Sequence, residues 1–351
     1  MNAAIKYSFF AALAVAALMF GTGPGDPMLD PTTASLGLLA VGQMSPGQVR
    51  VIDPILSNVA RGYRDPNRIA NMLFPRVPVQ VSGGQIIEFG KEAFRRYNMR
   101  RTPGANTLRV QLGYLGKPFA LVQDSLEGKV PFEHQRDASR VPGVDMGSRA
   151  VRTVMSIIER GLEIDAAEVA LDSNNYDASH VDTLTGTDQW SDDGSNPGQQ
   201  IRDYKEVIRS SIGVNPNTLM LGQTVFNAAA EHPTIKEQFK YTSADSITAE
   251  MLMRYFQVER LAIGQEIYWD DDNETMVDVW GDFALLAYVP ANASSNEEPS
   301  YGYTYMMEGH PIVEEPYQDR NAKSWIYPTT LERSPEIVGK DAGFLIQDLV
   351  A

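Results

Sequence analysis

Alternating apolar and polar residues in the first half of the chain predict two β-strands. The first run has valines at alternate positions, followed by Gly83-Gly84, which we interpret as a turn. The apolar positions of the two runs are Val77, Val79, Val81, Ile86, Ile87 and Phe89, then Leu108, Val110, Leu112 and Tyr114. Two strands alone bury little apolar surface. We therefore expect an exposed arm over residues 83–133 that lies on another chain and ends near Pro131.

The next regular pattern has the period of a helix. Between residues 147 and 172, apolar side chains recur along one stripe: Val151, Val154, Met155, Ile158, Leu162 and Val169. Asp145 stands where an N-cap is expected. Roughly 26 residues at about 1.5 Å each give a helix near 39 Å long, which suits an elongated subunit.

Shorter elements follow this helix. Residues 174–200 read as a loop with one strand near 181–184, and helices then alternate with strands over 201–290, which predicts an α/β lobe around a central sheet. Beyond a polar linker at 292–299, four more strands are predicted at residues 301–307, 312–316, 323–331 and 336–339. We expect these late strands to pack beside the long helix.

Composition excludes several classes of site. The 351 residues include no cysteine, so disulfides, thiolate zinc sites and cysteine nucleophiles are excluded. The net charge of −15 is unevenly spread: residues 50–160 carry 18 Lys and Arg against 10 Asp and Glu, and residues 161–351 carry 11 against 33. This asymmetry suits head-to-tail association of identical copies, and equally suits two solvated surfaces of opposite sign.

The basic residues of the arm are the candidate binding residues. Aromatic residues stand between them, as in Phe94 and Tyr97, so the arm could contact nucleic acid. We favour carboxylates of a neighbouring copy, because the acidic remainder would repel a polyanion. The predicted intersubunit contacts are Lys91, Arg95, Arg96, Arg100, Arg101 and Arg109.

Motifs for catalysis or cofactor binding are missing from the sequence. The four histidines, His134, His180, His232 and His310, stand far apart, and neither a Walker-type phosphate loop nor a nucleophile elbow occurs. The run from Asp270 to Glu274 resembles a calcium loop but has Thr275 where glycine is required, so a hairpin turn of solvated acids is the better interpretation. Asp192-Asp193-Gly194 is likewise interpreted as a turn. We predict no enzyme activity, no metal and no cofactor.

The N-terminus has three interpretations. Residues 9–20 are an apolar run behind Lys6, which outlines a secretory signal but is too short to span a bilayer as a helix. The run could instead form a buried or partner-packed helix, or translation could start at Met44. No membrane association is expected.

Several sequence blocks, in this order, resemble the major capsid proteins of tailed bacteriophages, which have the Hong Kong 97-type fold. The blocks are VIDPILSN (51–58), ARGY (60–63), LFPRVPV (73–79), IEFGKE (87–92), YDAS (176–179), TDQWS (187–191) and KSWIYP (323–328). Together they cover roughly residues 49–351. Residues before Met44 match nothing expected of that family.

The resemblance implies an α+β fold with an N-terminal arm, an extended β-hairpin loop, a peripheral domain with a long spine helix, and an α/β axial domain. The implied divisions are an N-terminal segment (1–48), N-arm (49–76), extended loop and its base (77–133), peripheral domain with spine helix (134–200), axial domain (201–290) and peripheral return strands (291–351). Some members join subunits through a lysine and an asparagine, and Lys91 and Asn321 are the required types. The sequence gives no ground for assigning that bond.

The function implied is a shell protein that assembles into pentamers and hexamers around double-stranded DNA. Its partners would be copies of itself, a portal, a scaffold or decoration protein, and packaged DNA held by non-specific contact, in a virion assembled in the bacterial cytoplasm. One alternative is an encapsulin-like nanocompartment that holds a cargo enzyme. The other is a hydrolase using scattered Asp and His residues, for which no constellation is found.

Overall fold

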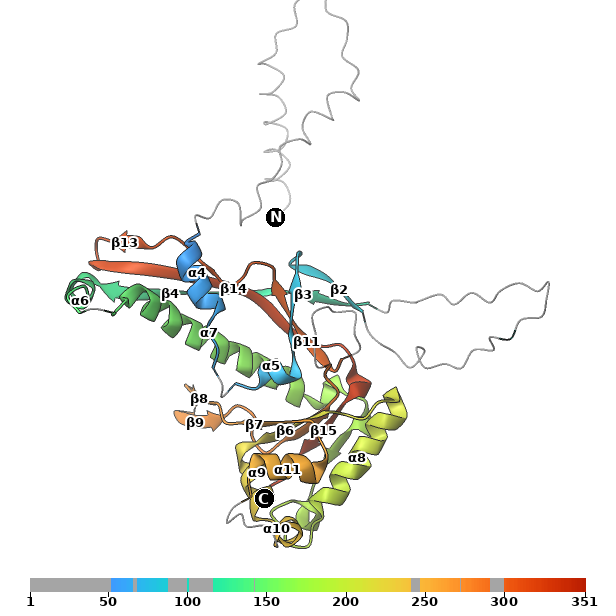
Figure 1. The fold of residues 1–351 in the computed structure, drawn as a ribbon. Coiled ribbons are helices and arrows are strands. Elements are labelled where there is room, and N and C mark those ends of the chain that lie inside the picture. Colours follow the sequence, from blue (N-terminus) through green and yellow to red (C-terminus); the bar gives the residue numbers. More distant parts are fainter. Residues whose placement is uncertain are drawn as a thin grey trace, which may run out of the picture. The chain divides into compact units, whose positions relative to one another are not determined.

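The computed structural model describes residues 52–65, 68–87, 100, 116–141, 143–240, 247–271, 273–290 and 300–351 (Figure 1). All belong to the unit Val51–Ala351. Its α-helices are α4 (Pro54–Arg61), α5 (Ala70–Leu73), α6 (Phe132–Ala138), α7 (Met146–Leu171), α8 (Pro197–Ile212), α9 (Gln223–Glu231), α10 (Pro233–Phe239) and α11 (Ala249–Phe256). Short 3-10 turns are η2 (Ser173–Asn175), η3 (Ala178–His180), η4 (Gly186–Asp188) and η5 (Lys340–Ala342).

The strands form four sheets within the described residues. They are β1 (Arg76–Val79), β2 (Gly83–Ile87), β3 (Gly116–Ala120), β4 (Val122–Pro131), β5 (Val181–Thr183), β6 (Thr218–Gly222), β7 (Arg260–Gly264), β8 (Ile267–Asp270), β9 (Thr275–Asp278), β10 (Ala284–Ala287), β11 (Gly302–Met307), β12 (Ile312–Val313), β13 (Tyr317–Asp319), β14 (Ser324–Ile337) and β15 (Gly343–Gln347). Helix and strand are mixed throughout, in agreement with the predicted α+β class.

A six-stranded sheet is built around the long strand β14. Its main path is β1-β11-β14-β12, and β4 and β13 also pair with β14. The β4–β14 ladder is antiparallel and runs for ten residue pairs, from Ser324↔Pro131 to Arg333↔Val122. β14 is one continuous strand where the sequence predicted two, at 323–331 and 336–339. Pro335 is accommodated because proline still offers a carbonyl acceptor and is tolerated where its missing N–H is not needed.

Helix α7 confirms the predicted long helix within one residue at each end. Asp145 caps it by accepting the Gly147 N–H at 3.0 Å, as its position predicted. The stripe around Val151 and Leu162 is buried and packs on β4 and β14. Gly128 of β4 lies against the helix, since a Cβ there would come within 3.1 Å of the Ala150 Cβ. The helix and the late strands therefore form two packed layers, as expected.

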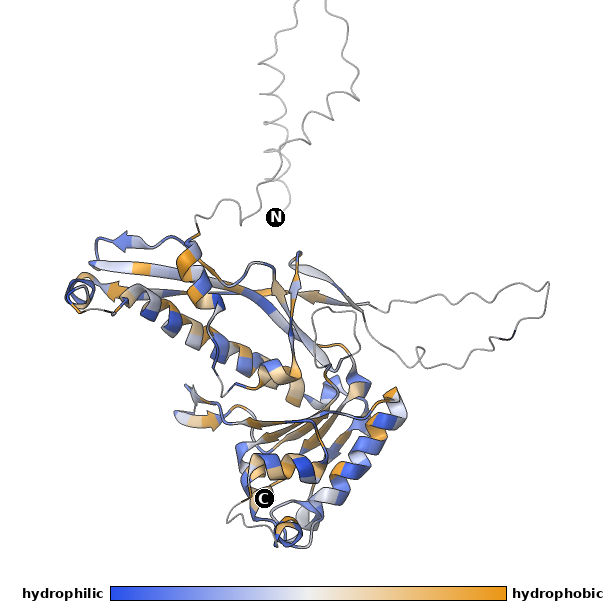
Figure 2. Cartoon of the chain, in the orientation of Figure 1, coloured by the Kyte–Doolittle hydropathy of each residue, from blue (hydrophilic) through white to orange (hydrophobic). Residues whose placement is uncertain are grey.

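A five-stranded sheet forms the second core, in the order β5-β15-β10-β6-β7; β15, β6 and β7 are labelled in Figure 1. β6 and β10 are buried along their whole length, and hydrophobic colour follows these strands in Figure 2. Leu219 and Leu286 pack there with residues of α8, α9 and α11, including Ile208 and Leu252. The predicted α/β lobe at 201–290 is thus confirmed as a sheet with helices.

One late strand belongs to a different sheet from the one expected. Residues 301–349 were predicted to complete the sheet beside the long helix, but β15 pairs parallel with β5 and antiparallel with β10. All four residues from Gly343 to Ile346 are buried. A strand that is apolar on both faces suits the interior of the five-stranded sheet. The order of elements along the chain did not indicate that β15 would pair with β5 and β10.

The predicted arm is shorter than expected where the structure describes it. Gly83 and Gly84 are the first residues of β2 and not a turn; they pair with Ala120 and Phe119 of β3. A Cβ at Gly84 would come within 3.0 Å of the Phe119 ring, so glycine lets this ring pack on the strand. The arm does not continue to Pro131, because β4 is hydrogen-bonded into the six-stranded sheet. Residues 88–99 and 101–115 lie outside the described residues.

Candidate intersubunit surface

Only one predicted contact residue is described. Arg100 is exposed. The other five, Lys91, Arg95, Arg96, Arg101 and Arg109, lie outside the described residues. Their role as intersubunit contacts therefore stays a prediction.

The base of the arm is fixed to the six-stranded sheet by aromatic packing. Phe119 of β3 stacks on Tyr305 of β11, with ring centroids 4.7 Å apart and planes inclined by 23°. Tyr303, Tyr305 and Val77 are buried in one cluster on which Phe119 packs. Burial also raises the pKa of the Tyr305 hydroxyl, so this residue stays neutral and serves as a packing group. Strand β3, at the base of the arm, is thus held against the six-stranded sheet.

A buried carboxylate, Glu163 of α7, connects three parts of the chain. Its Oε1 accepts the Ile69 N–H at 2.9 Å and the Trp280 Nε1–H at 2.8 Å, and its Oε2 accepts the Ala70 N–H at 2.9 Å. Burial raises the pKa of Glu163, although these three hydrogen bonds act to lower it. Glu163 thereby holds α5 and the segment after β9 against the long helix.

Three arginines extend this polar cluster. Arg76 pairs with Glu159 and donates to Asn71 Oδ1 at 2.7 Å. Arg160 donates to Glu266 at 2.6 Å, and the buried Arg68 lies 3.7 Å from the same carboxylate. The sequence did carry a signal for the cluster that our prediction missed. Glu159 and Glu163 interrupt the apolar stripe at i+4 spacing, which places both carboxylates on the buried face.

A second buried cation joins β14 to its neighbours. Arg333 lies 2.7 Å from Asp124 of β4 and 3.0 Å from Asp165 of α7, and it also reaches the Ile158 carbonyl at 3.3 Å. Burial raises the pKa of Asp165, and the Arg333 charge partly offsets this. Both polar clusters hold elements together within one copy.

His232 has structural partners. His232 Nε2 lies 3.0 Å from Ser195 Oγ and 3.1 Å from the Asp192 carbonyl, while Nδ1 contacts Thr234 at the start of α10. Ser195 and His232 are 4% and 2% exposed, which excludes a substrate from this pair. Among the described residues, no group of three His, Cys, Asp or Glu side chains is placed to hold a metal ion.

The two predicted turns are confirmed. Asp270 ends β8 and Asn273 lies in the connection to β9, with Asn273 Nδ2 donating to Asp270 Oδ2 at 2.7 Å. Gly194 N–H donates to Asp192 Oδ1 at 2.8 Å. Within the described residues of these two segments, no group of three carboxylate side chains is placed to hold a metal ion.

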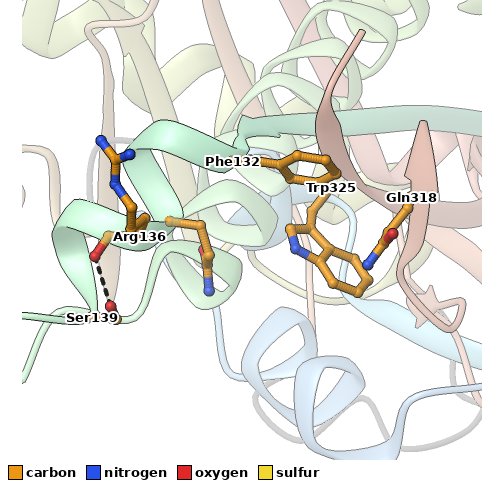
Figure 3. A pocket seen from close by; sticks show the side chains of 6 residues that line it. Phe132, Arg136, Ser139, Gln318 and Trp325 are labelled. Atoms are coloured by element: carbon orange, nitrogen blue, oxygen red, sulfur yellow. Dashed lines mark hydrogen bonds between the residues drawn. The ribbon is translucent and has the colours of Figure 1, made fainter. Parts of the chain in front are cut away.

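A surface pocket of about 370 Å³ lies where α6 meets β13 and β14 (Figure 3). The rings of Phe132 and Trp325 pack edge to face, with centroids 6.4 Å apart, and Gln318 lies beside the indole. Ser139 Oγ donates to the Arg136 carbonyl at 2.6 Å. The pocket is lined by no carboxylate, histidine or lysine, so general acid–base catalysis has no candidate group there.

No described helix is both long enough and apolar enough to cross a membrane. The apolar run at residues 9–20 lies outside the described residues.

Known proteins match the chain at the level of family, sequence and structure. Residues 164–296 match the family model described as phage major capsid protein E. The major capsid protein of Burkholderia phage BcepMu is 33% identical over 313 residues, covering 88% of this chain and 99% of the relative. The major capsid protein of Pseudomonas phage JBD67 is 25% identical over 267 residues, covering 72% and 82%.

A solved structure matches closely as well. The crystal structure of a phage-related protein from Bordetella bronchiseptica RB50 has 46% sequence identity and a TM-score of 0.77, covering 86% of this chain and 99% of that one. These matches favour a capsid protein over a cargo-holding nanocompartment or a hydrolase, and the relatives are structural proteins and not enzymes. Together they establish that the chain belongs to the family of phage major capsid proteins.

Proposed function

We propose that copies of this chain assemble into pentamers and hexamers of an icosahedral shell with the Hong Kong 97-type fold, enclosing the double-stranded DNA of a tailed phage. The supporting observation is the arm: a basic segment connects β2 and β3 in the sequence, and β3 packs on the six-stranded sheet. A basic arm on an otherwise acidic chain suits head-to-tail contact between identical copies.

Each part of the fold then has a role in the shell. Residues 83–116 are the extended loop that overlaps a neighbour. α7 is the spine helix of a peripheral domain that includes the six-stranded sheet. Residues 201–290 form most of the axial domain, which meets other copies at the five- and six-fold centres; β15 completes its sheet.

The remaining partners follow from this arrangement. A portal occupies one vertex, a scaffold or decoration protein assists the shell, and packaged DNA is held by non-specific contact. Assembly takes place in the cytoplasm of the host bacterium. The net charge of −15 supports weak, non-specific contact with DNA over tight binding, because like charges repel.

Charge reversal in the arm tests the proposal. Arg100→Glu together with Arg101→Glu replaces two attractive contacts by repulsive ones, and we expect it to abolish assembly. The measurement is electron microscopy and sedimentation of the purified full chain, where wild type gives particles of uniform diameter.

A matched control reverses the same amount of charge elsewhere. Arg149→Glu with Arg152→Glu changes two exposed arginines of α7, to which the proposal gives no contact with another copy, and should leave the particles intact. Particles that form normally from the arm variant would contradict the role given to the arm, and wild-type chain that stays monomeric would contradict the shell itself.

A further inference from the structure

The hairpin formed by β8 and β9 stands outside the five-stranded sheet as a separate two-stranded sheet (Figure 1). Its register pairs Ile267 with Asp278 and Trp269 with Met276. Residues that face each other across two strands, and residues two apart on one strand, share a face. Ile267, Trp269, Met276 and Asp278 therefore lie on the same side of the hairpin.

This face is apolar and exposed. Ile267 is 46%, Trp269 52% and Met276 64% exposed. The opposite face is anchored, because Tyr268 packs on the core cluster that contains Trp280. Single exposed apolar residues are ordinary, but three large ones gathered on a 12-residue hairpin form a patch of the kind found at binding surfaces.

The same hairpin is strongly acidic. Residues 267–278 include five Asp or Glu residues and no Lys or Arg. Asp271, Glu274 and Asp278 are exposed. A partner for this surface must therefore offer apolar side chains for the face and positive charge for the rim and tip.

Residues 91–101 of the arm have this chemistry. The segment holds five Lys or Arg residues and one Glu, with Phe94, Tyr97 and Met99 between them. Aromatic and arginine side chains are the residue types that contribute most to protein interfaces. The hairpin matches them with a tryptophan, a methionine and carboxylates of opposite sign.

We propose that the exposed face of the β8–β9 hairpin is the docking surface for residues 91–101 of another copy of this chain. The aromatic residues of that segment cover Trp269 and Met276, and its arginines pair with Asp271, Glu274 and Asp278. This rests on the proposed shell function and goes further, because it assigns the acidic surface on which the arm lies.

The absence of cysteine from the chain allows a direct test. Tyr97→Cys combined with Met276→Cys places one thiol on the segment and one on the hairpin. In assembled particles of the full chain, a short bismaleimide linker should join copies into a ladder of covalent oligomers on a denaturing gel. Tyr97→Cys with Val122→Cys is the control, because Val122 is 61% exposed on β4, outside the hairpin, and should give no ladder.

The possible outcomes distinguish failure of the docking proposal from failure of the shell proposal. Particles without a ladder from the 97/276 pair, or with an equal ladder from the 97/122 pair, would overturn the docking surface and leave the shell proposal standing. A ladder from Met276→Cys alone would mean that hairpins meet each other, which also overturns it. Wild-type chain that forms no particles would refute the shell proposal on which this one rests.

Charge exchange provides an independent test. Asp271→Lys with Glu274→Lys should prevent assembly, and adding Arg95→Glu with Arg96→Glu in the same chain should restore it, since the attraction is reversed on both sides. Trp269→Ala should raise the protein concentration needed for assembly about 30-fold, which is the usual effect of removing a buried interface tryptophan. Loss of assembly that the compensating change does not restore would contradict the pairing, provided that circular dichroism shows all variants folded.

Discussion

Glu163 shows how a single buried acid can determine where three segments lie. It is 1% exposed, and its donors come from the start of α5 and from Trp280. Removing a partner from a buried hydrogen-bonded group costs more than the bond contributes, because the remaining groups stay desolvated. A carboxylate here therefore specifies the arrangement more than it increases stability.

Glu163→Gln keeps the size of the side chain but leaves only one acceptor oxygen for three N–H donors. We expect the free energy of unfolding to fall by about 2 kcal/mol at neutral pH. Because burial raises the pKa of Glu163 above its ordinary 4.5, the folded wild type binds more protons than the unfolded chain between the two pKa values. Wild-type stability is thus greatest below the unfolded pKa and is lost as pH rises through the folded one.

The Gln variant does not titrate at this position. Its deficit should accordingly be largest below about pH 4.5 and shrink as the pH rises toward neutral, as measured by urea unfolding of both proteins from below pH 4.5 to neutral pH. Glu168→Gln, an exposed change on the same helix, is the control and should leave the curve unchanged. A constant deficit at all pH values would contradict the raised pKa.

At the scale of elements, the periodicity of apolar residues predicted most of the helices and strands. The apolar stripe of α7 and the cap at Asp145 were sufficient to predict the long helix, because a long helix carries its own repeating pattern. The return of β15 to the five-stranded sheet was not predictable, since pairing between distant strands leaves no local mark. For the candidate site, the run of Lys and Arg residues was enough to predict the basic arm. The exposed apolar face of the β8–β9 hairpin could not be predicted from the sequence, because exposure depends on which face of the hairpin the core covers.

The contact between β4 and α7 offers a test of packing. Gly128→Val adds a branched side chain where even a Cβ lies 3.1 Å from the Ala150 Cβ and 3.3 Å from Val154, and overpacking of this kind costs about 2 kcal/mol. We expect a lower thermal midpoint by calorimetry. Gln123→Val, an exposed change on the same strand, should have almost no effect. Equal midpoints for the two variants would show that helix and strand can separate without cost.

At the scale of the whole molecule, we expect the unequal distribution of charge to be the main determinant of the proposed association. The proposed contacts set a basic segment of one copy against an acidic hairpin of the next. Charges of this kind steer copies together and determine their register, and they are screened by salt. Association that depends on them should differ from purely apolar association in its response to ionic strength.

Raising the salt concentration from about 0.1 M to about 1 M shortens the screening length from about 10 Å to about 3 Å. We expect wild-type assembly, followed by light scattering, to become slower and less complete. Sodium sulfate, which strengthens apolar burial, is the informative comparison at equal ionic strength. Assembly that accelerates to the same extent with sodium sulfate and with the salt first used to raise the ionic strength would indicate apolar contacts alone.

The position of β15 has a consequence for the timing of biosynthesis. It lies between β5 and β10, yet it follows β5 by about 160 residues along the chain. The ribosome delivers residues in order, so β5 and β10 emerge without the strand that belongs between them. The sheet can close only after residue 347 has been translated and has left the exit tunnel. A nascent copy therefore cannot complete this sheet early, and we expect the order in which the strands appear to keep partly made chains out of the proposed shell.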